Sequence, residues 1–481
     1  MNTQMLINGE WIGAHSGKTF ERRDPVTGQV TTTASAMGAD DARAAVVAAR
    51  GAFADWSHVA PDQRRRLLLA AADRMEAREA QFVEAMLSET GSTRMWAGFN
   101  VRLAAGMLRE AASMTTQLIG DVIPANKPGI LAMGLWRPRG VCLAIAPWNA
   151  PVILATRAVA MPIACGNTVV LKSSELCPQT HALIGACFTE AGFPPGVLNI
   201  VHNAPADAPA LVAAMIADPD VNHVNFTGSS AVGRVIGRLA GEHLKPALLE
   251  LGGKAPLVVL ADADLDGAVN AAIFGAFMNQ GQICMSTERI VVEDSIADAF
   301  VDRLAARAQA LVADDPRHDP VLGSVVSEDA AARMDGLIAD ALAKGAVLRA
   351  GGSRRGSIVP ATILDHVTPA MRLYAEESFG PVKAVVRVAD EAAAVACAND
   401  TDYGLSSAVF SQDITRAIRV ANRLNVGICH INGPTVSDEP QMPFGGVRDS
   451  GFGRFGGRAA IAEFCQFQWL TIENPAQHYP F

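Results

Sequence analysis

The sequence lacks an uninterrupted apolar run of about 18 residues, which a membrane-spanning helix requires. The best candidate segment, residues 144–165, is interrupted by Asn149, Arg157 and two prolines. The first residues also lack the basic flank and apolar run of a secretory signal peptide. We therefore expect a protein that does not enter the membrane and that stays in the cytoplasm.

Basic residues are not in excess, and metal-binding patterns are missing. Forty lysines and arginines stand against 49 aspartates and glutamates, a net charge of −9, which argues against a nucleic-acid partner. The eight cysteines form no C-x-x-C pair, and the ten histidines form no H-E-x-x-H or H-x-x-H pattern. We expect reduced, mostly buried thiols and no metal site.

What the sequence does contain is enough apolar material for a large core. Half of its 481 residues are hydrophobic and 19% are charged, which is typical of an ordered chain of two or three domains. Residues 40–120 are expected to be mostly helical, with Asp40 and Asp41 as N-cap candidates for the first helix. Apolar residues at helical spacing run over 65–90, before a stop at Gly91.

Short apolar runs without alternation begin at residue 141, as expected of strands buried on both faces of a sheet. Five such runs lie at Val141–Pro147, Thr168–Leu171, Val197–Val201, Val221–Phe226 and Pro246–Leu251. They alternate with helical stretches at Pro151–Cys165, Pro178–Ala191, Ala206–Ala217 and Ser230–Gly241. This alternation predicts an α/β fold with a doubly wound parallel sheet.

A second α/β series follows, and Gly252-Gly253 is a natural hinge between the two. Its expected strands are Leu257–Leu260, Arg289–Val292, Val382–Val388, Ser407–Phe410 and Gly427–Ile431. Its expected helices are Leu265–Gln280, Ile296–Ala313, Ala331–Lys344, Glu391–Ala398 and Ile414–Leu424.

Two extended apolar segments, Ile130–Arg137 and Phe464–Ile472, belong to neither series. A two-stranded unit by itself is marginal in water. We expect this β-ribbon to complete a partner's sheet in a homodimer or homotetramer. A flap packed on its own domain is the alternative.

Cys284 lies in the run Asn279-Gln280-Gly281-Gln282-Ile283-Cys284, about 30 residues after Glu250-Leu251-Gly252-Gly253-Lys254. A thiol in a Gly- and Gln-rich loop, with a carboxylate in a second Gly-rich turn, indicates covalent thiol catalysis with a general base. Since a free thiol has a pKa of about 8.5, we expect local dipoles or cations to favour its thiolate. A salt bridge to Lys254 is the alternative for Glu250.

Polar residues follow the expected strands, where open α/β sheets bind ligands. Asn149 follows the first strand and can donate to an oxyanion or form an Asx turn. Lys172 and Glu175 follow the second, where a carboxylate can accept from a ribose 2′-hydroxyl; a solvated charge pair is the alternative. Gly228 follows the fourth and allows a ligand to approach a helix N-terminus, and Gly233 allows that helix to pack closely on the sheet.

Two further motifs are less telling alone. The run Gly451-Phe452-Gly453-Arg454-Phe455-Gly456 fits G-x-G-x-x-G but follows no expected strand and opens no βαβ unit. We interpret it as a C-terminal turn region. Residues 376–381, Glu-Glu-Ser-Phe-Gly-Pro, are by themselves typical of a surface loop.

Together, the Glu250 and Cys284 segments, residues 376–381 and Pro443-Phe444-Gly445-Gly446 resemble the aldehyde dehydrogenase superfamily, and the resemblance spans residues 6–472. It implies that Cys284 attacks an aldehyde to form a thiohemiacetal, whose oxyanion is bound by Asn149 and the Cys284 N–H. Hydride transfer to a nicotinamide then leaves a thioester, which water activated by Glu250 hydrolyses.

The resemblance also implies domains and a cofactor, NAD with NADP as the alternative. Residues 1–120 and 141–250 would form the Rossmann-like NAD-binding domain, 251–435 the catalytic domain, and 121–140 with 460–481 the oligomerisation element. The implied cofactor contacts are Pro147, Trp148, Lys172, Ser174, Glu175, Gly228, Ser229, Val232, Gly233, Leu251, Gly252, Glu377 and Phe379.

Residues 277–289 resemble the branch that contains salicylaldehyde, benzaldehyde and vanillin dehydrogenases, which implies an aromatic aldehyde substrate. Ala150 stands where many aliphatic-aldehyde members have a bulky aromatic. The expected substrate contacts are Trp96, Ala150, Arg157, Ile283, Met285 and Phe444. A core position for Trp96 and a salt bridge for Arg157 are the alternatives. An aliphatic or semialdehyde dehydrogenase, a CoA-acylating enzyme and a non-catalytic relative are the alternative functions.

Overall fold

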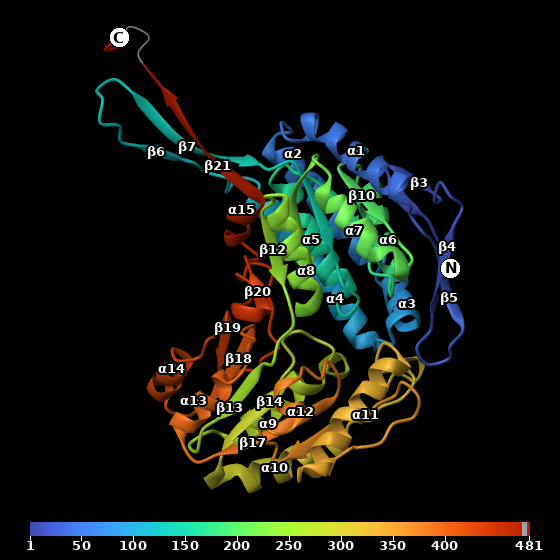
Figure 1. The fold of residues 1–481 in the computed structure, drawn as a ribbon, viewed down its shortest axis with the longest axis vertical. Helices are drawn as coiled ribbons and strands as arrows, with labels where there is room; N and C mark the ends of the chain where they lie inside the picture. Colours follow the sequence, from blue (N-terminus) through green and yellow to red (C-terminus); the bar gives the residue numbers. More distant parts are fainter. Residues whose placement is uncertain (474–478) are drawn as a thin grey trace.

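The computed structural model describes residues 1–473 and 479–481. Figure 1 shows two α/β bodies joined by extended segments, with a β-ribbon that projects away from the first body. This arrangement confirms the predicted fold class.

The first body contains an eight-stranded sheet in the order β20-β12-β11-β8-β9-β10-β2-β3. Its strands are β2 (Met5–Ile7), β3 (Glu10–Ile12), β8 (Val141–Ile145), β9 (Thr168–Lys172), β10 (Leu198–Val201), β11 (Val221–Thr227), β12 (Ala247–Glu250) and β20 (Gly451–Phe452). The five central strands, β12 to β10, are parallel and are the five predicted runs. The chain moves outward from β8 to β10 and then returns to β11 on the other side of β8. The carboxyl ends of β8 and β11 therefore flank the switch point, where a doubly wound sheet binds its ligand.

Four helices connect these parallel strands, as predicted: α5 (Pro151–Ala164), α6 (Pro178–Glu190), α7 (Ala208–Ala217, preceded by η1, Pro205–Asp207) and α8 (Ser230–Glu242). Both faces of the sheet are covered, so every residue of β8, β9 and β10 is buried. This burial explains why their sequences are continuous apolar runs.

The second body is built on a seven-stranded sheet in the order β15-β16-β17-β14-β13-β18-β19. Its strands are β13 (Pro256–Val259), β14 (Arg289–Glu293), β15 (Val347–Ala350), β16 (Thr362–Asp365), β17 (Val382–Val388), β18 (Ser406–Phe410) and β19 (Ile428–Ile431). Its helical segments are α9 (Leu265–Phe277), η2 (Met278–Gly281), α10 (Asp294–Gln309), η3 (Pro316–His318), α11 (Glu328–Ala343), α12 (Arg372–Ala375), α13 (Glu391–Asn399) and α14 (Ile414–Ala421). The sequence did not predict β15 and β16, which are four residues each.

The N-terminal region differs from the prediction at several points. The three-stranded sheet of β1 (Asn2–Thr3), β4 (Thr19–Arg23) and β5 (Val30–Ser35) was not predicted. Helix α1 (Ala39–Trp56) begins before Asp40 and Asp41, so neither is its N-cap; the Asp41 carboxylate instead accepts from the backbone N–H of the N-cap residue, Gly38, at 2.8 Å. The helical run over 65–90 is two helices, α2 (Pro61–Ala77) and α3 (Glu79–Thr90), followed by α4 (Arg94–Met114).

The projecting ribbon consists of β6 (Asp121–Ile123), β7 (Leu131–Pro138) and β21 (Cys465–Ile472), the last preceded by α15 (Ala459–Phe464). The two predicted extended segments pair antiparallel with each other over eight residues. Large apolar side chains on the ribbon, such as Trp469 at 77% and Ile472 at 56%, are exposed.

The glycine pattern at 451–456 does not occupy a βαβ unit. Gly451 and Phe452 form β20 next to β12, with Gly451 opposite Glu250, so our interpretation of the whole pattern as a turn was wrong for these two residues. Among the described residues, no helix is both long and apolar enough to cross a membrane.

Candidate active site

Asn149 lies just beyond the carboxyl end of β8, and its side chain is directed at the loop that ends in Cys284. Its amide Nδ2 donates to the backbone oxygen of Gln282 at 3.0 Å, so the alternative of an Asx turn does not apply. The backbone oxygen of Asn149 accepts from Trp96 Nε1 at 3.1 Å and from Asn279 Nδ2 at 2.9 Å. These bonds fix an amide donor beside the thiol.

The loop before Cys284 is held by its own polar side chains. Helix α9 ends earlier than predicted because Asn279 and Gln280 adopt left-handed backbone conformations, with φ of 48° and 54°. Gln280 Nε2 and Gln282 Oε1 bond to backbone groups of residues 324 and 326 at 3.0 Å each. The amide side chains near the thiol therefore anchor the loop to the second body.

Glu250 ends β12 with its carboxylate buried beside the Cys284 thiol. Neither carboxylate oxygen has a hydrogen bond that meets ordinary geometry within the described chain. Burial disfavours the charged form and raises the pKa of Glu250 to about 7, against the smaller opposing effects of the Cys284 thiol and Arg157. Lys254 pairs with Glu288 at 2.9 Å, so the alternative of a Glu250–Lys254 salt bridge is wrong.

The Cys284 thiol is not pre-ionised in this structure. Burial, and then the charge of Glu250, raise its pKa well above the ordinary value, while Arg157 opposes them more weakly. Our expectation that dipoles or cations favour the thiolate was therefore wrong.

Cys284 lies where two cavities meet. One, of about 430 Å³, opens between the bodies at the switch point of the first sheet. The other, of about 380 Å³, lies between α4, α5 and the Cys284 loop. Asn149, Leu154 and Cys284 line both. A molecule in either cavity therefore reaches the same sulfur.

The cavity at the switch point is lined by many of the expected cofactor residues, namely Pro147, Trp148, Gly228, Ser229, Leu251, Gly252, Glu377 and Phe379. The second cavity is lined by all the expected substrate residues, namely Trp96, Ala150, Arg157, Ile283, Met285 and Phe444. The structure thus places eight of the expected cofactor residues and all the expected substrate residues around two separate spaces that share the thiol.

The match to a family model settles the family, because the aldehyde dehydrogenase family model covers residues 11–470. The chain belongs to the aldehyde dehydrogenase family. It is 58% identical to a vanillin dehydrogenase of Pseudomonas fluorescens and 50% identical to a salicylaldehyde dehydrogenase of Pseudomonas putida, over the full length of each chain. The crystal structure of a salicylaldehyde dehydrogenase from Pseudomonas putida G7, complexed with salicylaldehyde, matches with a TM-score of 0.99 at 49% identity and full coverage of both chains.

Aldehyde dehydrogenases use NAD or NADP, and the first cavity fits such a dinucleotide. In its wall, Gly252 lies so close to Glu377 that a larger residue would clash. A Cβ on Gly252 would lie 2.8 Å from Glu377 Oε2. Glu377 uses Oε1 to accept from the Gly253 N–H at 2.8 Å, which leaves acceptor capacity for hydroxyl groups. Ser229 caps α8, so the free N–H groups of that helix start can face an anion.

Five expected cofactor residues do not line this cavity. Lys172 and Glu175 form an ion pair, and Glu175 also accepts from Asn203 Nδ2 at 2.8 Å. Ser174 is buried nearby. Of the two α8 residues, exposed Val232 donates its N–H to the Ser229 cap, and Gly233 leaves room for Leu251, which a Cβ would meet at 2.3 Å.

The alternatives for two of the substrate residues, a core position for Trp96 and a salt bridge for Arg157, both hold in part. Trp96 is 3% exposed and belongs to the core while it lines the cavity. Arg157 is ion-paired with Asp438 and lies 4.2 Å above the Phe444 ring.

Sequence reasoning missed several cavity residues. Thr227, Arg333 and Tyr403 line the cofactor cavity, and Met95, Phe99, Phe274, Val436 and Asp438 line the other. Of these, Thr227 alone had a usable signal, because it directly precedes Gly228 at the end of a predicted strand. The others come from helices and loops whose packing the local pattern does not reveal.

Proposed function

We propose that this chain oxidises aromatic aldehydes to carboxylic acids with NAD as the preferred electron acceptor. The supporting observation is that the thiol and the Asn149 amide lie between a cavity suited to a dinucleotide and a cavity walled by aromatic and aliphatic side chains. The similarity to a vanillin dehydrogenase and a salicylaldehyde dehydrogenase supports the substrate class.

In this proposal the Cys284 thiol releases its proton to solvent, and the sulfur attacks the aldehyde carbon to give a thiohemiacetal. Asn149 Nδ2 and the Cys284 N–H donate to the oxyanion. The bound dinucleotide supplies a two-electron acceptor for the substrate carbon. Glu250 then removes a proton from water, which attacks the thioester and releases the acid and the Cys284 thiol.

An aldehyde panel tests the substrate class. We expect kcat/KM for benzaldehydes, including hydroxylated ones, to exceed that for aliphatic aldehydes and semialdehydes, measured by nicotinamide absorbance with each dinucleotide. Faster oxidation of long-chain aliphatic aldehydes would refute the aromatic assignment. An absolute requirement for coenzyme A would favour the acylating alternative. The presence of Glu250, a base for hydrolysis of the thioester by water, argues against that alternative.

Ala150 is expected to give the second cavity room for a ring. It is 6% exposed, directly follows Asn149 and lines that cavity. Ala150→Phe should lower kcat/KM for benzaldehyde by about ten- to a hundredfold, because the added ring occupies substrate space. Acetaldehyde, measured with the same variant, is the internal control and should lose much less. Equal losses for both aldehydes would place Ala150 outside the selective part of the pocket.

The same proposal includes a homo-oligomer and a cytoplasmic location. The exposed apolar side chains of β21, including Trp469, support burial of the ribbon against a second copy. All eight cysteines are free thiols, which is typical of a reducing compartment. Sedimentation of the purified chain tests the oligomer, and a monomer at micromolar concentration would refute it.

A further inference from the structure

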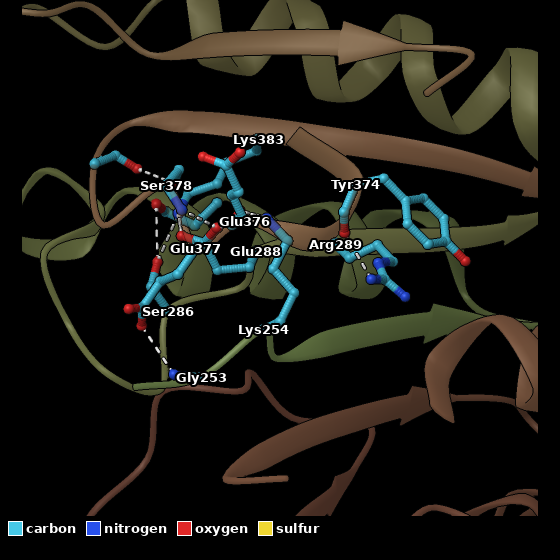
Figure 2. Close-up of polar contacts among 12 residues, drawn as sticks. Gly253, Lys254, Ser286, Glu288, Arg289, Tyr374, Glu376, Glu377, Ser378 and Lys383 are labelled. Carbon is cyan, nitrogen blue, oxygen red and sulfur yellow. Dashed lines mark hydrogen bonds and ion pairs between the residues drawn. The ribbon is translucent and has the colours of Figure 1, made fainter. Parts of the chain in front are cut away.

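A charge cluster is buried beside the active site (Figure 2). The Glu288 carboxylate accepts from Lys254 Nζ and Lys383 Nζ at 2.9 Å each, and from Ser378 N at 2.7 Å and Ser378 Oγ at 2.6 Å. We call Glu288, Lys254, Lys383 and Ser378 the Glu288 cluster. Each member is at most 2% exposed.

Glu288 is ionised within this cluster. Burial alone would raise its pKa, but the charges of Lys254 and Lys383 and the hydrogen bonds from Ser378 outweigh burial and lower the pKa to about 2. Replacing a buried ionic network by apolar residues often costs no stability. Stability alone therefore does not account for three charged side chains at this place.

The cluster connects three of the segments that contribute to the active site. Lys254 follows Glu250 by four residues, and Glu288 follows Cys284 by four residues. Their ion pair thus ties the segment of the base to the segment of the nucleophile. Ser378 brings in the third segment, the loop over 376–378, through its two bonds to Glu288.

Both neighbours of Glu377 are held by the cluster. Lys254 Nζ donates to the backbone oxygen of Glu376 at 2.6 Å, and Ser378 is bonded to Glu288 through its backbone and its hydroxyl. Figure 2 shows Glu376, Glu377 and Ser378 gathered around Glu288 and Lys254. The cluster, whose members do not line the cofactor cavity, therefore helps to fix the backbone on both sides of Glu377. Arg333, which does line the cavity, also donates to the backbone oxygens of Glu377 and Ser378.

We propose that the Glu288 cluster positions the Glu377 carboxylate to bind the ribose on the nicotinamide side of the dinucleotide. This inference rests on the proposed function, in which Glu377 is that ribose contact. Glu288, Lys254, Lys383 and Ser378 are positioning residues. They act on cofactor affinity through Glu377, because their side-chain hydrogen bonds stay within the cluster or lead to the loop that contains Glu377 and to the segment after Cys284.

The test is NAD binding to the purified protein, measured by titration calorimetry without aldehyde. Glu288→Gln should raise the Kd for NAD by about ten- to a hundredfold, because a small displacement of one binding group has effects of this size. The double variant Glu288→Gln/Glu377→Gln should bind no more weakly than Glu377→Gln alone, because coupled residues are not additive. Additive losses, or an unchanged Kd in Glu288→Gln, would overturn the inference.

Matched variants separate positioning from stability. Asp365 in β16 is another fully buried carboxylate of the same sheet, ion-paired with Arg387 at 2.8 Å. Asp365→Asn should lower the Tm without changing the Kd for NAD. Ser378→Ala leaves both lysines paired with Glu288, so it replaces Glu288→Gln in the test if that variant does not fold. Ser378→Ala should also raise the Kd for NAD, by a smaller factor. An unchanged Kd in this variant would count against the inference. If the parent protein binds no dinucleotide, the proposed function itself fails, whereas normal parent binding with unaltered variants refutes only the cluster's role.

Discussion

Cys284→Ala is expected to lower kcat for aldehyde oxidation by more than about 10⁴-fold, because the covalent intermediates form on this sulfur. No neighbouring side chain can replace the thiol: Asn149 is an amide, and Glu250 is the base. The measurement is steady-state nicotinamide reduction with benzaldehyde. Dinucleotide affinity should change little, which distinguishes lost chemistry from lost folding.

Cys429→Ala is the matched control for the thiol. Cys429 is also a half-buried free cysteine, but it lies in β19 and lines neither cavity. We expect its replacement to leave kcat within about twofold of the parent, as is usual away from a site. Comparable turnover in Cys284→Ala and Cys429→Ala would end the thiol mechanism.

The strands that the sequence predicted best are those buried on both faces. In β8 to β12 and in β13, β14 and β17, burial makes the apolar run continuous, so pattern and structure agree. The failures have equally local causes. Edge strands such as β15 are half-exposed and only four residues long, and α9 ended early because Asn279 and Gln280 take left-handed conformations whose cost is met by tertiary hydrogen bonds.

The candidate site likewise contains residues that the sequence could predict and residues that it could not. Glu250, Cys284 and Asn149 could be selected because each follows a recognisable strand or loop motif, and the structure brings all three together. The Glu288 cluster could not be predicted in this way, because Lys254 and Lys383 look like ordinary surface lysines in the sequence. They acquire their roles only in the folded chain, where two segments more than 120 residues apart meet. The pKa of Cys284 was misjudged for a similar reason. It depends on burial against Glu250, which no local pattern records.

Glu250→Gln is expected to separate acylation from hydrolysis of the thioester. Glutamine keeps the shape of the side chain but cannot accept a proton, so the steady-state rate should fall by about 10²- to 10⁴-fold. A rapid burst of nicotinamide reduction, near one equivalent per active site, should precede the slow phase. Mass spectrometry of the quenched enzyme should show the acyl group on Cys284. Turnover equal to the parent's would require another base.

The pH dependence follows from the raised pKa of Glu250, which is about 7. The ionised form is the base, so thioester hydrolysis should fall as the pH is lowered through 7, and this limb should be absent in Glu250→Gln. The stability of the folded protein changes with pH in the opposite direction to the hydrolysis rate. The folded protein binds this proton more tightly than an unfolded chain, in which the pKa of a glutamate is about 4.3. The stability therefore falls as the pH rises, and the charged Glu250 costs stability above pH 7. The glutamine variant should therefore unfold at a higher temperature than the parent at pH 8, although it turns over far more slowly. A lower Tm together with the lost activity would mean that the variant fails by unfolding rather than by loss of the base.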